Sequence, residues 1–115
     1  MAKYKYKPLR YLIDQSYGGA YPKHGPLEVE GFAVQLPEPF HRFRVCVRED
    51  WFYGWAIDHY DTGFALMARN DFTADTRNQV VDELIRRLND PERRAKGVAS
   101  MRKHGFGWIA DEAGL

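Results

Sequence analysis

The stretch FHRFRVCVREDWFYGWAIDHYDTGFALMAR, residues 40–69, decides the fold because it predicts three consecutive β-strands. In His41–Arg48, Trp51–Tyr60 and Phe64–Arg69, apolar or aromatic residues alternate with polar or small ones, which is the period of a half-buried strand. Asp61-Thr62-Gly63 predicts the turn between the last two strands, since its glycine can adopt a positive φ. The stretch therefore predicts an antiparallel meander.

The two faces of this predicted sheet differ in composition, because successive side chains of a strand point to opposite sides. The first face carries Phe43, Val45, Val47, Trp55, Ile57 and Leu66. The second face carries Arg42, Arg44, Arg48, Phe52 and Arg69. We expect the first face to be buried. We interpret the second as a solvent-facing surface that either binds a partner or carries solvated charge.

Residues 1–26 read as a basic arm followed by a loop rich in glycine and proline. The candidate partner-binding residues of the arm are Tyr4, Lys5, Tyr6 and Lys7. Lysine interleaved with tyrosine suits contact with an acidic protein or with a nucleic-acid backbone. It also suits an edge strand over Ala2–Leu9, in which the lysines face solvent and prevent aggregation.

Residues 27–115 are expected to form one α+β domain, since the chain length matches a single domain. A further strand is predicted over Leu27–Leu36, with a bulge at Gly31. Pro37 and Pro39 end it, because proline cannot donate to a strand ladder.

Two helices are predicted after the meander. Thr73 or Asp75 can cap the first helix. Its apolar positions recur at helical spacing and are Val80, Val81, Leu84, Ile85 and Leu88. Asp90-Pro91 predicts the start of a second helix that runs to about Lys103 and ends at Gly105. The expected fold is an antiparallel β-meander of three to four strands packed against one or two C-terminal helices.

The basic residues of these helices are Arg86, Arg87, Arg93, Arg94, Lys96, Arg102 and Lys103. Acidic residues interleave with them, which predicts a salt-bridged solvent face. A basic ridge at the helix ends is the alternative interpretation.

The net charge of the chain is +1. A dedicated nucleic-acid binder is usually more basic, and a DNA mimic is usually more acidic. The charges are unevenly distributed. Residues 1–24 carry five cations and one anion, whereas residues 25–66 carry three cations and seven anions. The chain therefore combines a basic arm with an acidic middle.

Cys46 is the only cysteine, so an internal disulfide is excluded and a reducing cytosol is expected. No apolar segment resembles a signal peptide or reaches the length of a membrane span. We expect a cytoplasmic protein that does not enter a membrane.

Catalytic and metal sites are not expected. The histidines His24, His41, His59 and His104 are scattered and form no metal-binding pair at helical spacing. Asp58 and His59 point to opposite faces of one strand, so they cannot form a catalytic dyad there. Nucleophile and phosphate-loop motifs are absent from the sequence. We expect a protein that is not an enzyme and has neither a metal nor another cofactor.

The segment GWAIDHYDTGFALMA, followed by a helix with a threonine cap, resembles small accessory proteins of phages and mobile elements. Those proteins pair a Trp-x-x-x-His-x-x-Thr-Gly-like hairpin with a helix, and the resemblance covers Trp55 to Leu88. The resemblance implies a short, cytosolic, non-enzymatic protein that modifies or blocks a host machine, as inhibitors of bacterial defence systems do.

The sequence therefore predicts a small binding protein that acts through protein–protein contacts, as a phage-type inhibitor of a host machine such as a CRISPR-Cas complex does. The alternative is a nucleic-acid-binding accessory protein that uses the arginine-bearing sheet face. The partner's identity and the oligomeric state stay open.

Overall fold

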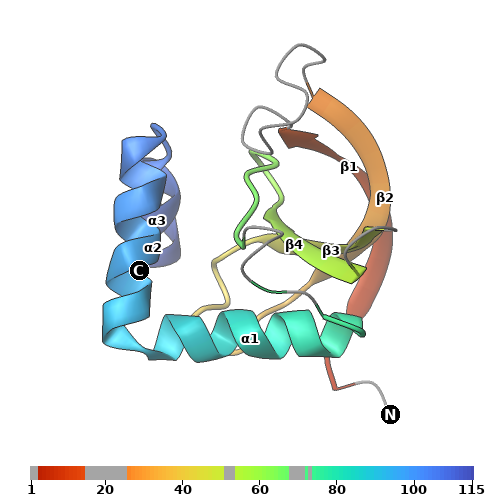
Figure 1. The fold of residues 1–115 in the computed structure, drawn as a ribbon, viewed down its shortest axis with the longest axis horizontal. Coiled ribbons are helices and arrows are strands. Elements are labelled where there is room, and N and C mark those ends of the chain that lie inside the picture. Colours follow the sequence, from red (N-terminus) through yellow and green to blue (C-terminus); the bar gives the residue numbers. More distant parts are fainter. Residues whose placement is uncertain (1–2, 15–25, 51–53, 68–71, 73) are drawn as a thin grey trace.

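The computed structural model describes residues 3–14, 26–50, 54–67, 72 and 74–115. The elements follow the chain as β1 (Tyr6–Asp14), β2 (Pro26–Val34), β3 (Val45–Asp50), β4 (Gly54–His59), α1 (Arg77–Asn89), α2 (Pro91–Lys103) and α3 (Gly107–Ala113). The strands form one antiparallel sheet in the order β1-β2-β3-β4 (Figure 1). The predicted α+β fold, a meander followed by C-terminal helices, is confirmed.

The helices lie on one side of the sheet. Figure 1 shows α1 running across the base of the sheet, with α2 and α3 side by side next to it. The main core fills the space between them. Phe43, just before β3, belongs to this core. Its sheet residues include Val45, Val47 and Ile57, and its α1 residues include Val81, Leu84 and Leu88. Trp55, Leu66 and Ile85 are partly buried against this core, so the predicted apolar face is confirmed.

The opposite face of the sheet is not open to solvent along its whole length, contrary to expectation. β1 and β2 bend strongly (Figure 1) and fold over β3 and β4. Tyr11 and Ile13 of β1 are thereby buried with Cys46 of β3 in a second apolar cluster. The curled sheet thus covers part of its own face away from the helices. The alternation of apolar and polar residues along a strand does not reveal such a curl.

Gly31 allows this curl. The β1–β2 register runs without interruption from Tyr6 opposite Val34 to Asp14 opposite Pro26, so the predicted bulge is absent from this ladder. A Cβ atom at Gly31 would lie 2.3 Å from the carbonyl oxygen of Val47. Glycine at this position therefore allows the β2 and β3 backbones to approach each other closely.

The N-terminal arm forms most of β1, which lies at the edge of the sheet. The edge-strand interpretation is therefore confirmed, although the strand begins at Tyr6 and extends past Leu9 to Asp14. β3 begins later than predicted, so Arg42 and Arg44 precede it. The predicted strand over Phe64–Arg69 is wrong where the structure describes it, because Ala65 forms only an isolated bridge with Asp58. The turn before it is confirmed, with Gly63 at a φ of 71°.

The helix ends follow local chemistry. Thr76 caps α1 in a capping box with Gln79, one position after the predicted Asp75; Thr73 lies outside the described residues. Asp90 caps α2 as predicted, and Gly105 follows that helix with a φ of 83°. α3 was not predicted, and its buried residues Ile109, Ala110 and Ala113 place the C-terminal tail in the core.

Candidate functional site

The antiparallel strand order brings four chain segments to one end of the sheet. The starts of β1 and β3 and the ends of β2 and β4 meet there. Lys7, Ala33, Cys46 and Asp58 lie opposite one another in a row across all four strands, on the face away from the helices. Just beyond this row, the Tyr60 amide donates a 3.0 Å hydrogen bond to the Arg44 carbonyl. The arm lysines and Arg44 thus share one end of the sheet, although they are distant in the sequence.

A groove of about 530 Å³ opens at this end of the sheet. Its described lining consists of Lys5, Lys7, Leu9, Ala33, Val34, Gln35, His41, Phe43, Arg44, Val45, Cys46 and Tyr60, which together we name the cationic groove. Aliphatic and aromatic residues form the floor, and two lysines, an arginine and a histidine add polar groups. The described lining contains no aspartate or glutamate, so an anion would meet no charge repulsion from it.

Arg44 is partly held in place. Its Nη1 lies 3.3 Å from Oδ1 of Asp61, and its guanidinium lies 4.6 Å from the centre of the Tyr60 ring. The side chain nevertheless stays 61% exposed, so its remaining donors face solvent. Lys5 and Lys7 are exposed, and neither has an ion-pair partner in the described part of the chain. These three cations are available to a ligand.

The arm tyrosines are engaged inside the protein. The Tyr4 hydroxyl hydrogen-bonds the Asp82 carboxylate, and the Tyr6 hydroxyl donates to Oδ1 of Asn78 at 2.5 Å, both on α1. Burial, followed by the bond to Asp82, raises the pKa of Tyr4. Tyrosine and lysine alternate along the arm, so the tyrosines pack on α1 while Lys5 and Lys7 point to the cationic groove.

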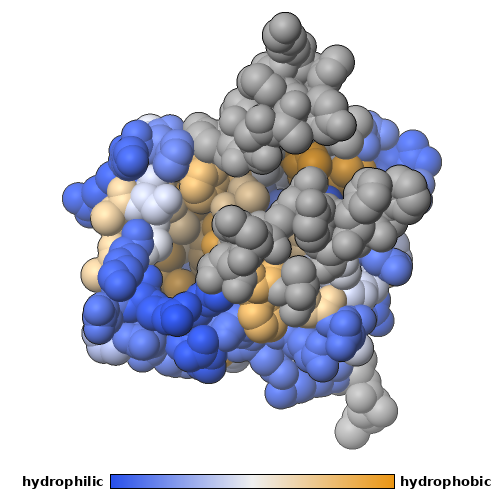
Figure 2. Space-filling view, in the orientation of Figure 1, coloured by the Kyte–Doolittle hydropathy of each residue, from blue (hydrophilic) through white to orange (hydrophobic). Residues whose placement is uncertain are grey.

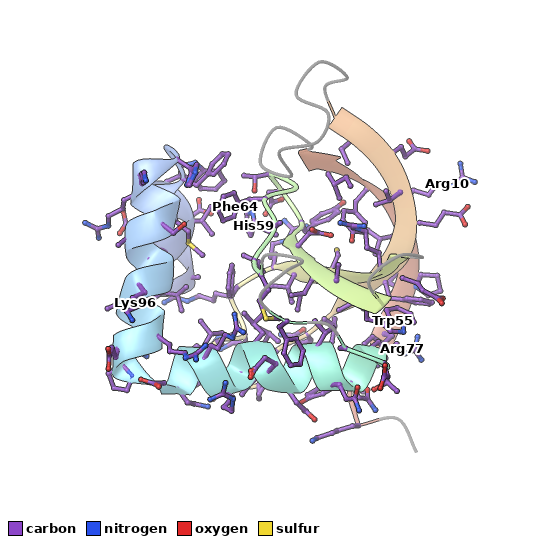
Figure 3. All side chains as sticks on the ribbon, in the orientation of Figure 1. Arg10, Trp55, His59, Phe64, Arg77 and Lys96 are labelled. Atoms are coloured by element: carbon purple, nitrogen blue, oxygen red, sulfur yellow. The ribbon has the colours of Figure 1, made fainter. Side chains whose placement is uncertain are left out.

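Arg77 completes this aromatic layer at the start of α1. Its guanidinium lies 3.9 Å from the centre of the Tyr6 ring and 4.7 Å from that of Phe32. Trp55 continues the layer, with its ring centre 6.2 Å from that of Phe32, and Figure 3 labels Trp55 and Arg77. The rings join the arm, the sheet and α1, which is a structural role.

The other predicted arginines do not join the cationic groove. Arg42 is exposed near the C-terminal end, where a Cβ atom on Gly114 would lie 2.5 Å from its Nη2. Arg48 is buried, which corrects its expected place on a solvent face. Phe52 and Arg69 lie outside the described residues. Of the predicted binding residues that the structure describes, the cationic groove unites only Lys5, Lys7 and Arg44.

Arg48 belongs to a buried polar cluster instead. Its Nε donates to Oδ2 of Asp58 at 2.9 Å, and the Tyr11 hydroxyl donates to the same oxygen at 2.8 Å. Burial, followed by the charge of Asp58, raises the pKa of Tyr11, which keeps the hydroxyl protonated as a donor. The same two causes raise the pKa of Cys46 to about 12, so its thiol is not an activated nucleophile.

His59 is buried at the end of β4. Its Nδ1 is hydrogen-bonded to Oγ1 of Thr62 at 2.9 Å. Its ring stacks on Phe43 at 5.9 Å and contacts Trp108 of α3 edge-on at 6.0 Å. Burial lowers the pKa of His59 and favours the neutral ring. The residue joins β4 to α3 in the core.

Among the described residues, no group of three or more histidine, cysteine or acidic side chains is arranged to hold a metal ion. The helices in the described ranges are too short and too polar to cross a membrane.

Comparison with known proteins gave no match to a family model, to a curated protein or to a solved structure.

The residues of the cationic groove that were not predicted to bind a partner include three with hydrogen-bonding side chains, Gln35, His41 and Tyr60. Each follows a strand end or lies in the loop before β3. In an antiparallel meander, the end of one strand lies beside the start of the next. Aligning the predicted strand ends in this way could have indicated Gln35 and Tyr60. No sequence signal indicated His41.

Proposed function

We propose that this protein is a non-enzymatic binding protein that holds an acidic segment of a partner protein in the cationic groove. The observation that supports this is the convergence of Lys5, Lys7 and Arg44 on one groove with an apolar floor. A guanidinium group can bind a carboxylate through two parallel hydrogen bonds, and lysines add mobile positive charges. The apolar floor offers contact to the aliphatic parts of the same segment.

The floor of the cationic groove favours a peptide over a nucleic acid. Single-stranded nucleic acids stack their bases on open aromatic rings. Of the two aromatic residues in the described lining, Phe43 is buried, and the guanidinium of Arg44 already lies over the ring of Tyr60. The net charge of +1 also gives little long-range attraction to a polyanion.

We further propose that the partner belongs to a bacterial host machine, such as a CRISPR-Cas complex, and that binding in the cytoplasm blocks it. The resemblance of residues 55–88 to phage accessory proteins supports this choice. Nucleic-acid binding is the second candidate, favoured by the three cations of the groove, since each can contact a phosphate.

A matched pair of variants tests the site. In the first, Lys5→Gln, Lys7→Gln and Arg44→Gln are combined, which removes the charges from exposed side chains. In the second, Arg10→Gln removes a cation of β1 that is 67% exposed and pairs with Glu28 and Glu30 on the other face of that strand. Figure 3 shows Arg10 pointing away from the sheet.

The parent and each variant are used to capture partners from a bacterial lysate, with and without nuclease. A captured partner is then purified, and its affinity for each protein is measured at several salt concentrations. We expect the parent and Arg10→Gln to bind a nuclease-resistant partner that the triple variant loses. Capture that depends on nucleic acid, with affinity falling steeply with salt, would support the second candidate. Normal binding by a folded triple variant would exclude the cationic groove as the site.

A further inference from the structure

A second groove, of about 430 Å³, lies between α1 and α2. Its described lining consists of Phe43, Leu66, Leu84, Arg87, Leu88, Arg93, Arg94, Lys96, Gly97, Val98, Met101 and Leu115, which we name the helix groove. Figure 2 shows apolar surface bordered by hydrophilic residues on this side of the molecule. The volume lies within the range of pockets that hold small ligands.

The two helices face the groove with matched stripes. Arg94, Gly97, Val98 and Met101 follow one another along a single face of α2 at helical spacing, and all line the groove. Leu84, Arg87 and Leu88 form the facing stripe on α1. In both stripes, aliphatic side chains lie beside at least one arginine, so the groove is apolar at its floor and positive at its rim.

Gly97 gives the groove its open side. It lies in the interior of α2, where glycine is less favourable than alanine. A Cβ atom at this position would meet no other atom within 4 Å, so protein packing does not require glycine there. A glycine at such a place leaves room for a ligand to approach the helix backbone.

The charges around the groove favour an anion. Arg94 is half-buried, and no described residue forms an ion pair with it or with Arg93. Lys96, labelled on α2 in Figure 3, pairs with Glu92 at 3.7 Å on the exposed side of the helix. The described lining includes no acidic side chain. A half-buried arginine beside an apolar floor is a site for a ligand that carries a negative charge on an apolar body.

From these observations we infer that the helix groove binds a small amphipathic anion, a carboxylate with an aliphatic chain. The carboxylate lies at Arg94, with Arg93 beside it, and the chain lies over Gly97 against Leu84 and Leu88. The helix groove shares only Phe43 with the described lining of the cationic groove, so this inference does not depend on the proposed function.

Decanoate is the probe, titrated into the full-length protein by calorimetry. Decan-1-ol tests the need for the charge, and acetate tests the need for the chain. Gly97→Leu fills the open side with a better helix former, and Arg94→Gln removes the half-buried charge. Lys103→Gln is the matched control, because Lys103 is an exposed cation of α2 outside the groove lining. Circular dichroism checks that each variant is folded.

We expect decanoate to bind the parent and Lys103→Gln equally, and Arg94→Gln about tenfold more weakly, as expected for the loss of one charge-assisted hydrogen bond. Gly97→Leu should not bind. Equal binding of decan-1-ol, or decanoate binding that survives both groove substitutions, would overturn the inference. So would a dimer that Gly97→Leu dissociates, since a second copy would then occupy the groove.

Discussion

The Tyr11 hydroxyl donates a 2.8 Å hydrogen bond to the Asp58 carboxylate, although the two residues lie on the first and last strands of the sheet. The curl of the β1–β2 hairpin makes this contact possible. Arg48 binds the same carboxylate oxygen at 2.9 Å, so one buried anion receives two donors from two other strands. The cluster ties β1 to β3 and β4.

Tyr11→Phe should lower the free energy of unfolding by about 1.5–3 kcal/mol, the usual range for a hydrogen bond to a charged group. The substitution leaves the ring in place and removes one donor from the buried Asp58 carboxylate. Urea unfolding followed by tryptophan fluorescence measures the change. Tyr60→Phe is the control and should change stability little, because the described residues offer the Tyr60 hydroxyl no hydrogen bond. Equal stability of Tyr11→Phe and the parent would contradict the curled arrangement.

Arg48→Gln and Arg44→Gln should differ sharply in stability. Arg48 is 9% exposed and pairs with a fully buried carboxylate, so its loss should cost about 3–5 kcal/mol, as for other broken buried ion pairs. Arg44 is exposed, and its loss should cost less than about 1 kcal/mol. Thermal and urea unfolding of both variants test this contrast. Similar losses of stability in the two variants would indicate that Arg48 lies on the solvent face.

Gly31→Ala should destabilise the protein, whereas Gly97→Ala should stabilise it. The new Cβ atom at residue 31 would lie 2.3 Å from the Val47 carbonyl oxygen, so the β2 and β3 backbones must separate. At residue 97 the new atom meets nothing, and alanine gains roughly 0.5–1 kcal/mol of helix preference. Denaturant midpoints compare the two variants directly. A neutral Gly31→Ala would show that the close approach is absent.

The Cys46 thiol should not react with Ellman's reagent in the folded protein. It is fully buried, and burial raises its pKa to about 12, so thiolate is scarce at pH 8. Because Cys46 is the only cysteine, the absorbance of the released thiolate reports on this site alone. We expect labelling to rise with urea along the unfolding curve. Rapid, complete labelling in native buffer would contradict the burial of this strand face.

Stability should fall as the pH is lowered through about 6.5, the ordinary pKa of histidine. Burial lowers the pKa of His59 in the folded state, an effect that Arg44 reinforces and Asp61 opposes. The unfolded chain therefore takes up the proton first, and stability is lost by up to about 1.4 kcal/mol per pH unit below that point. His59→Gln should show a smaller loss between pH 7.5 and 5.5. The same pH slope in both proteins would assign the effect to another group.

Much of the fold could be predicted because its signals are local. Alternation identified the buried face through Phe43, Val45 and Val47, and Asp90-Pro91 located the boundary between α1 and α2. The site was harder to predict. Lys5, Lys7 and Arg44 were all candidates, but their common groove depends on which strand ends meet.

The wrong predictions concern residues whose surroundings are formed by segments that are distant in the sequence. Alternation placed Arg48 and Asp58 on one face correctly, but that face is covered by Tyr11, which lies far away in the sequence. The predicted strand after Gly63 has suitable residues, yet within the described residues 64–67 only Ala65 bridges to β4. α3 has seven residues and little periodicity of its own, and packing in the core stabilises it.

Isolated bridges also occur at the outer edge of β4. Ala65 pairs with Asp58, and Ala74 pairs with Trp55. At the other edge, β1 contains Pro8, which has no amide hydrogen to offer to an incoming strand. Open strand edges are templates for growth into fibres. With one edge occupied and the other interrupted, two folded molecules have little opportunity to join strand to strand, so a concentrated solution should resist amyloid-like assembly for as long as the fold persists.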